Sequence, residues 1–152
     1  MKLLTHAVFS SGLVFVVTKN LLSVETPLAI LISAISIVMQ YTIDALSHEQ
    51  VGNIIRRTSL FHSLSGATAL AIVFTLFIYV VVRNLQLLLP CAIGCLVSSY
   101  SHLLLDSITE KGIYVKGRRY VRKRMISSNN ALLNTIFTLI GIWIWLIGFK
   151  VF

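Results

Sequence analysis

The sequence predicts an all-α fold, a polytopic membrane bundle of about five transmembrane helices (four to five) in a single integral membrane domain, residues 1–152. Two observations support this prediction. Hydrophobic residues make up 57% of the chain and charged residues only 12%, whereas an average soluble domain carries about 25% charged residues. The apolar residues also gather in five runs, at 3–17, 27–43, 64–82, 85–105 and 131–149.

The lengths of these runs fit membrane spans. The last three are long enough as helices to cross a hydrocarbon core of about 30 Å at about 1.5 Å per residue. The first two are shorter, and a bilayer accommodates short spans by thinning. The run at 3–17 could instead be a signal peptide that starts at Lys2, but no small-residue cleavage site follows it. We therefore expect a retained helix there.

The third and fourth runs show two further local features. Only residues 83 and 84 separate them, so we expect an antiparallel helix pair. Cys91 and Cys95 share a face of the fourth run. For such cysteines, the role of small buried hydrophobic residues is much commoner than that of a disulfide or a ligand pair.

The basic residues predict the orientation of the bundle. Five spans place ten of the 13 lysines and arginines on one side: Lys2, Arg56, Arg57, Lys111, Lys116, Arg118, Arg119, Arg122, Lys123 and Arg124. Lys19, Arg83 and Lys150 fall on the other side. By the positive-inside rule the N-terminus is cytoplasmic, the C-terminus lies outside, and residues 107–130 form a basic cytoplasmic loop. The expected location is the cell membrane, as a multi-pass protein.

His102 and Asp106 form the most informative pair in the chain. They end the fourth apolar run, and their spacing of four places imidazole and carboxylate on the same helix face. A charged side chain at membrane depth costs about 2.5 kcal/mol or more, so such residues are usually functional. The pair therefore predicts a metal site near the end of this span.

The other histidines and the second aspartate fall on the same side of the membrane in this topology. His6 begins the first span, Asp44 ends the second, and His62 begins the third. An anion at the C-terminal end of a helix is unfavourable, which favours a functional role for Asp44. His48 lies in a polar loop and is equally compatible with simple solvation. Imidazole and carboxylate ligands suit Zn²⁺ first, with Mn²⁺ or Fe²⁺ as alternatives.

The basic loop has two interpretations. The commoner one is a topology determinant; the functional one is attraction of anionic lipid headgroups, worth about 1 kcal/mol per basic residue. Nucleic-acid binding is disfavoured, because the loop holds few aromatic side chains for stacking, chiefly Tyr114 and Tyr120. Membrane lipids are therefore the expected partners, and the oligomeric state is left open.

Several motifs together resemble the YdjM-like family of membrane-bound, predicted metal-dependent hydrolases. They are Thr5-His6, the aspartate that ends the second span, Arg57 followed by His62-Ser63, and the His-x-x-x-Asp stretch at 102–106 that precedes Gly112. The family often has Pro-Asp-x-Asp at the end of the second helix, where this chain has only Asp44, so a single ion is expected. The resemblance marks six residues: His6, Asp44, Arg57, His62, His102 and Asp106.

The sequence thus favours a metal-dependent hydrolase whose site lies at the cytoplasmic interface. Its expected substrate is a lipid or a lipid-linked ester or phosphodiester. The expected metal ligands are His6, Asp44, His62, His102 and Asp106. The expected catalytic residues are Asp44, as general base, and Arg57, whose planar guanidinium matches two oxygens of a phosphate or carboxylate. The alternative is a non-enzymatic membrane protein, either a metal or proton carrier or a structural subunit.

We expect a tag at the C-terminus to be accessible from outside the cell and a tag within residues 111–124 to be accessible only from the cytoplasm. The reason is the ten-to-three division of basic residues between the two sides. Protease protection in intact cells and in inverted vesicles measures both positions. Finding the two tags on one side would contradict the topology and the convergence of the histidines that depends on it.

Overall fold

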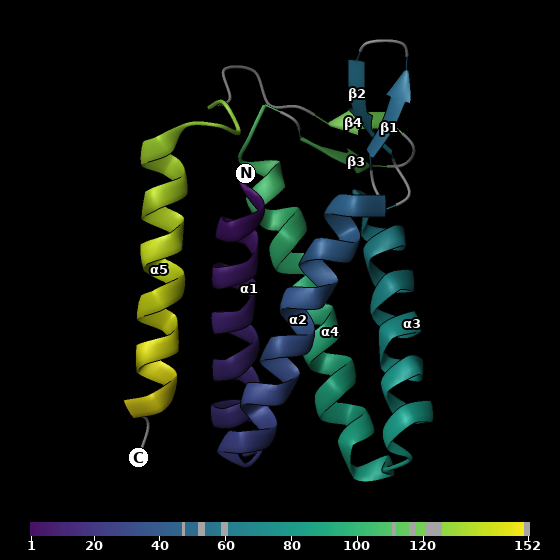
Figure 1. The fold of residues 1–152 in the computed structure, drawn as a ribbon, viewed down its shortest axis with the longest axis vertical. Coiled ribbons are helices and arrows are strands. Elements are labelled where there is room, and N and C mark those ends of the chain that lie inside the picture. The colour runs from purple at the N-terminus through teal and green to yellow at the C-terminus, as the bar shows by residue number, and fades with distance from the viewer. Residues whose placement is uncertain are drawn as a thin grey trace.

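The predicted all-α membrane fold is confirmed. The computed structural model describes residues 1–46, 48–51, 54–58, 61–110, 112–115, 118–120 and 126–150. The long helices are α1 (Leu3–Val16), α2 (Thr26–Leu46), α3 (Leu64–Val82), α4 (Leu88–Ser107) and α5 (Ala131–Lys150) (Figure 1). Five helical segments within the described residues are long and apolar enough to span a membrane. The side of the membrane on which the N-terminus lies stays a prediction.

Short elements complete the chain. The π-helix η1 (Val17–Leu21) continues α1, and the 3₁₀ turn η2 (Leu85–Leu87) leads into α4. Two antiparallel hairpins, which the sequence did not predict, lie between the long helices. One consists of β1 (His48–Val51) and β2 (Ile54–Arg57), and the other of β3 (Ile113–Val115) and β4 (Arg118–Tyr120).

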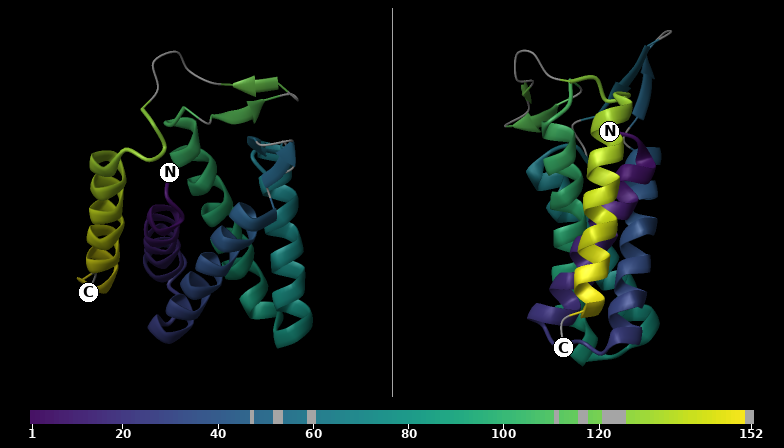
Figure 2. Two further views of the ribbon diagram at one scale, coloured as in Figure 1. Left: turned by 45° about the horizontal axis from the view of Figure 1, so that its top comes forward. Right: turned by 90° about the vertical axis from the view of Figure 1, so that its left-hand side faces the viewer.

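The helices form a row with one helix laid across it. The order in the row is α5, α1, α4 and α3, and α2 packs on both α1 and α4 (Figures 1 and 2). Both hairpins and the N-terminus lie at one end of the bundle, and the C-terminus lies at the other. We call the first of these the hairpin end. The end of α2, the start of α3 and the end of α4 all meet there, as the alternation of spans requires.

The turn between α3 and η2 is as tight as the sequence predicts. Helix α3 ends at Val82, and Arg83 takes a left-handed conformation with a φ of 52° while its N–H bonds to the Tyr79 carbonyl. A left-handed residue after the last turn is a common way to end a helix. The Asn84 side chain then accepts a hydrogen bond from the Gln86 N–H. The result is the antiparallel α3–α4 pair.

An apolar core lies between α1, α2, α3 and α4. It is built from buried residues of all four helices: Val14, Ile32, Met39, Ile43, Leu70, Ala71, Ile78, Cys91 and Cys95. Both cysteines are buried and free, which confirms their predicted role as small hydrophobic residues. The core extends along the bundle and packs the four helices together.

Glycines allow α1 and α5 to approach closely. A Cβ added at Gly12 would lie 2.7 Å from the Gly141 carbonyl oxygen, and one added at Gly141 would lie 2.8 Å from Phe9 Cα. Farther along the same contact, Phe15 stacks on Trp145 with ring centroids 4.5 Å apart. Small residues at such contacts are typical of membrane helix pairs, where close packing stabilises association.

Replacing Gly141 by Val should destabilise the bundle by about 1–3 kcal/mol, because the new side chain meets the backbone of α1 rather than a movable side chain. The measurement is chemical unfolding of the purified protein in detergent. Ile142→Val, at a position 45% exposed on the same helix, is the matched control and should leave the unfolding midpoint unchanged. Equal midpoints for the two variants would contradict the close α1–α5 contact.

Candidate metal centre

Four side chains from three separate parts of the chain meet at the hairpin end. His6 lies in the first turns of α1, His62 lies just before α3, and His102 and Asp106 occupy the last two turns of α4. Asp106 is at the centre, because the Nε2 atom of each histidine lies close to its carboxylate. The sequence predicted all four of these residues, and the fold brings them together.

The distances around Asp106 are nearly equal. His6 Nε2 lies 3.2 Å from Oδ1, while His62 Nε2 and His102 Nε2 lie 3.3 Å and 3.1 Å from Oδ2. All four side chains are at most 2% exposed. The α-amino group of Met1 also lies 3.3 Å from Oδ1. The carboxylate is therefore surrounded by nitrogen atoms in a site closed to solvent.

This spacing matches the requirements of a bound metal ion. Tetrahedral zinc with bonds of about 2.0 Å holds its ligand atoms about 3.3 Å apart. One ligand atom from each of His6, His102 and Asp106 lies within 4.8 Å of the others, so these three form the tightest set. His62 joins that set through its contact with Asp106 Oδ2. The chemistry of the donors and their spacing both fit one divalent ion.

The orientation of two imidazole rings is also compatible with a metal site. His6 Nε2 and His102 Nε2 lie 3.2 Å and 3.1 Å from the Asp106 carboxylate oxygens. Their rings stack with centroids 4.1 Å apart and planes 23° apart. The two nitrogen atoms therefore converge on the carboxylate, an arrangement that is compatible with ligand atoms around one ion.

Local structure explains how His62 reaches the site. Ser63, the next residue, is the N-cap of α3, and its hydroxyl accepts a hydrogen bond from the Gly66 N–H. The backbone N–H of Tyr114 in β3 donates to the His62 carbonyl at 2.7 Å. A helix cap on one side and the second hairpin on the other thus hold His62 over the end of α4.

The C-terminal end of α4 is closed by residues that follow Asp106. Thr109 donates to the Asp106 carbonyl through both its backbone N–H, at 3.1 Å, and its hydroxyl, at 3.0 Å. Gly112 then takes a left-handed conformation with a φ of 62°, and its N–H bonds to the Thr109 carbonyl. This turn leads the chain from the carboxylate directly into β3, which contacts His62.

Polar contacts that the sequence did not reveal support the first turns of α1. Asn134 of α5 accepts hydrogen bonds at its Oδ1 atom from the Lys2 N–H at 2.8 Å and from the Thr5 hydroxyl at 3.0 Å. Ser101 and Ser10 share a hydrogen bond of 2.6 Å between α4 and α1. These contacts set the height of His6 relative to His102.

Gln40 is the residue of the site that sequence reasoning missed. It lies in α2, is fully buried, and its Oε1 atom lies 2.6 Å from His102 Nδ1. One signal was available, because an amide side chain within an apolar run of a membrane span marks an internal polar contact. Metal-binding histidines usually have such a partner on the second ring nitrogen.

The two predicted residues Asp44 and Arg57, and His48, whose role the sequence left open, are not placed in the cluster. Asp44 lies in the last turn of α2, half-buried, and does not belong to the set whose ligand atoms lie within 4.8 Å of one another. Arg57 pairs with His48 across the first hairpin, but the side chains of both lie outside what the structure describes. The proposed roles of Asp44 and Arg57, and the participation of His48, stay predictions. Parts of the basic loop, namely Lys111 and residues 116–117 and 121–125, also lie outside the described residues.

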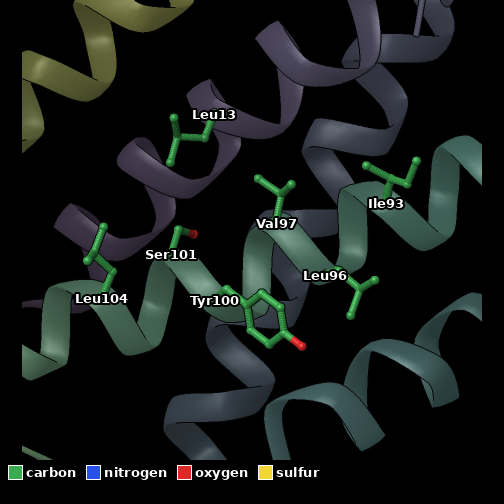
Figure 3. Close-up of a pocket in the computed structure, with 7 residues that line it drawn as sticks. All are labelled: Leu13, Ile93, Leu96, Val97, Tyr100, Ser101 and Leu104. Carbon is green, nitrogen blue, oxygen red and sulfur yellow. The ribbon is translucent and has the colours of Figure 1, made fainter. Parts of the chain in front are cut away.

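An apolar groove runs along the neighbouring face of α1 and α4 (Figure 3). It has a volume of about 440 Å³ and is lined by Leu13 of α1 and six residues of α4, namely Ile93, Leu96, Val97, Tyr100, Ser101 and Leu104. The Tyr100 hydroxyl is held by Thr68 of α3 at 2.9 Å. Two of the lining residues, Ser101 and Leu104, lie within two positions of His102 in α4.

Comparison with known families gives one match. A family model described as a protein of unknown function, DUF1286, matches residues 1–105, which is more than two thirds of the chain. The chain belongs to the DUF1286 family. The DUF1286 match includes His6, Gln40, His62 and His102 and ends one residue before Asp106. No curated protein and no solved structure matches the chain. The resemblance to the YdjM-like family stays a prediction.

Replacing His102 by Ala or Asp106 by Asn should weaken binding of Zn²⁺ by more than about 100-fold, the upper range for loss of an outer partner alone. Each change removes a ligand atom from a set with 3.1–3.3 Å spacing, while α4 keeps its apolar length. Elemental analysis and Zn²⁺ titration of the purified protein in detergent measure the effect.

Cys95→Ala is the control for this pair. Cysteine is a residue type that can bind metal, and Cys95 is buried on α4, but it belongs to the apolar core and not to the cluster. It should leave metal content unchanged. Unaltered Zn²⁺ affinity in both His102→Ala and Asp106→Asn would show that the cluster is a hydrogen-bonded structural feature and not a metal site.

Proposed function

We propose that this protein is a membrane-embedded hydrolase that depends on a single divalent metal ion held by His6, His102 and Asp106, with His62 as a fourth contact. The observation that carries the proposal is the convergence of three imidazole nitrogens on one buried carboxylate at 3.1–3.3 Å. Mixed imidazole and carboxylate donors favour Zn²⁺, with Mn²⁺ or Fe²⁺ as alternatives. When bound, such an ion supplies Lewis acidity and an activated water near neutral pH.

The protein's own residues would supply the remaining functions. Asp106 neutralises part of the ion's charge and holds the histidines around one point. Asp44, in the last turn of α2 at the same end of the bundle, is proposed as the general base that accepts a proton from water. Arg57 of β2 is proposed to hold two oxygens of the substrate, because its guanidinium is planar and carries paired donors.

A lipid or lipid-linked ester or phosphodiester is the proposed substrate. The cluster lies at the ends of membrane-length helices, which is the depth of lipid headgroups. The apolar groove beside it, on α1 and α4, suits a hydrocarbon chain and lies against the helices that carry His6 and His102. Basic residues of the neighbouring loop would enrich anionic lipid at the same surface.

A second function is favoured by one specific observation, the near-complete burial of the cluster. Structural zinc sites are closed and have four protein ligands, whereas catalytic sites keep one position open. His6, His62, His102 and Asp106 together offer four donors and are at most 2% exposed. In this alternative the ion joins the ends of α1, α3 and α4 without catalysis. The two functions differ in whether substrate reaches the ion.

Wild-type protein loaded with Zn²⁺ and incubated with extracted lipids should release a product that Asp44→Asn does not release, because the variant lacks the general base. Mass spectrometry of the lipids before and after incubation detects the product. Arg57→Lys should lower turnover about tenfold or more while leaving Zn²⁺ content unchanged, since a point charge replaces a two-pronged contact.

Wild-type protein that binds Zn²⁺ but yields no product absent from Asp44→Asn would count against hydrolysis. The closed structural site would then be the better account. A protein that binds no metal, even after reconstitution in lipid, would exclude both functions.

A further inference from the structure

Gln40, in the last third of the membrane-length helix α2, makes three short contacts with α4. Its Oε1 atom lies 2.6 Å from His102 Nδ1. Its Nε2 atom lies 3.0 Å from the Ser98 carbonyl oxygen and 2.7 Å from the Ser98 hydroxyl. The side chain is fully buried, so these contacts are its hydrogen-bonding environment and bulk water does not compete for them.

The carbonyl group of Ser98 decides which way the amide of Gln40 points. A carbonyl oxygen can only accept a hydrogen bond, so the atom of Gln40 that faces it must be the NH₂ donor. The amide oxygen then faces His102 and can only accept. His102 Nδ1 must therefore carry a proton and donate it to Gln40.

In the neutral ring this assignment leaves Nε2 free to bind a cation, and the neutral ring is the form that a metal ion requires. A neutral imidazole with its proton on Nδ1 has a lone pair on Nε2. His102 Nε2 lies 3.1 Å from Asp106 Oδ2, on the side where His6 and His62 also converge. The lone pair thus points into the proposed metal position. The opposite tautomer would direct an N–H group there and could not bind a cation.

Gln40 is held at two points that lie one helical turn apart on α4. Ser98 and His102 are separated by four residues and face α2 together. A 180° rotation of the amide would place its oxygen against the Ser98 carbonyl oxygen, where neither atom can donate. That hydrogen bond would be lost, so the Ser98 carbonyl determines the orientation of the amide.

We propose that Gln40 is a positioning residue that fixes the Nδ1-protonated tautomer of His102, so that His102 Nε2 is the ligand atom for the ion. This inference rests on the proposed metal centre for its function, but the tautomer itself does not require metal. Helix α2 contributes none of the four converging side chains. Through Gln40 it contacts one of them, His102, directly.

The first test reads the tautomer in the metal-free protein. Ring ¹⁵N chemical shifts distinguish the two neutral forms, and the chain contains only four histidines, so His102→Ala assigns the signal. The wild-type protein should show His102 protonated on Nδ1. Gln40→Leu removes the acceptor. It should shift His102 towards the Nε2-protonated form, which a histidine side chain favours in water. An unchanged His102 signal in Gln40→Leu would overturn the proposal.

The second test reads metal affinity by titration with Zn²⁺ and with Co²⁺, whose visible spectrum reports coordination. Gln40→Leu should weaken binding by about 10–100-fold, the range expected for loss of an orienting partner. Gln40→Glu keeps an acceptor for Nδ1–H, and in its protonated form can donate to the Ser98 carbonyl, so it should retain affinity within about tenfold. Ser33→Ala, a change at a buried residue of α2 whose hydroxyl donates to the Ala29 carbonyl of the same helix, should have no effect.

The outcomes separate this inference from the proposed function. If the tautomer changes but the Zn²⁺ affinity of Gln40→Leu equals that of the wild type, Gln40 does not position a ligand and the proposal is wrong. If the wild type binds no metal at all, the metal centre fails, while the ¹⁵N spectra still decide whether Gln40 sets the tautomer. If Gln40→Leu does not fold, weak Zn²⁺ binding by a folded Gln40→Glu would also contradict the acceptor role.

Discussion

The buried carboxylate of Asp106 is the constraint on which the hairpin end of this protein depends. A carboxylate removed from water is costly unless nearby donors or cations compensate it. Here nitrogen atoms of His6, His62 and His102 lie 3.1–3.3 Å away and come from the beginnings of α1 and α3 and from α4 itself. Surrounding the carboxylate in this way requires three helices to end at one height and one place. A divalent ion among these donors would satisfy the same constraint more completely, because it interacts with every ligand at once.

Other polar contacts extend outward from this centre and join the remaining helices. Gln40 connects α2 to His102, Ser10 and Ser101 connect α1 to α4, and Asn134 connects α5 to the first turn of α1. In a bilayer these groups have no water to bind, so each must find its partner within the protein. The apolar side chains of the core around Cys91 and Cys95 need no such pairing. The bundle is thus held by close apolar packing together with specific polar contacts.

Much of the site could be predicted because membrane spans restrict where side chains lie. Spans that alternate in direction return every second connection to the same side, so His6, His62, His102 and Asp106 were expected to meet, and they do. The same reasoning could not decide whether Asp44 joins them, since sharing a membrane side does not determine the direction of a side chain. Asp44 lies at the expected end of α2, yet outside the tightest set of ligand atoms. The two hairpins were missed because short strands in polar connections carry too few residues for a clear alternating pattern.

The sequence by itself indicated about five helices, their approximate limits and the gathering of His6, His62, His102 and Asp106 at one end of the bundle. Hydrophobic run length and helical spacing are sufficient for these, because the bilayer sets one length and the helix sets one period. Only the tertiary structure decided that Asp106 is the centre of the cluster, that Gln40 faces His102, and that Asn134 supports the first turn of α1. Those facts depend on helix rotation and height, which are set by packing such as the contact of Gly12 with Gly141. Gly12 and Gly141 are more than one hundred positions apart, and a local sequence pattern cannot predict contacts between residues so distant in the chain.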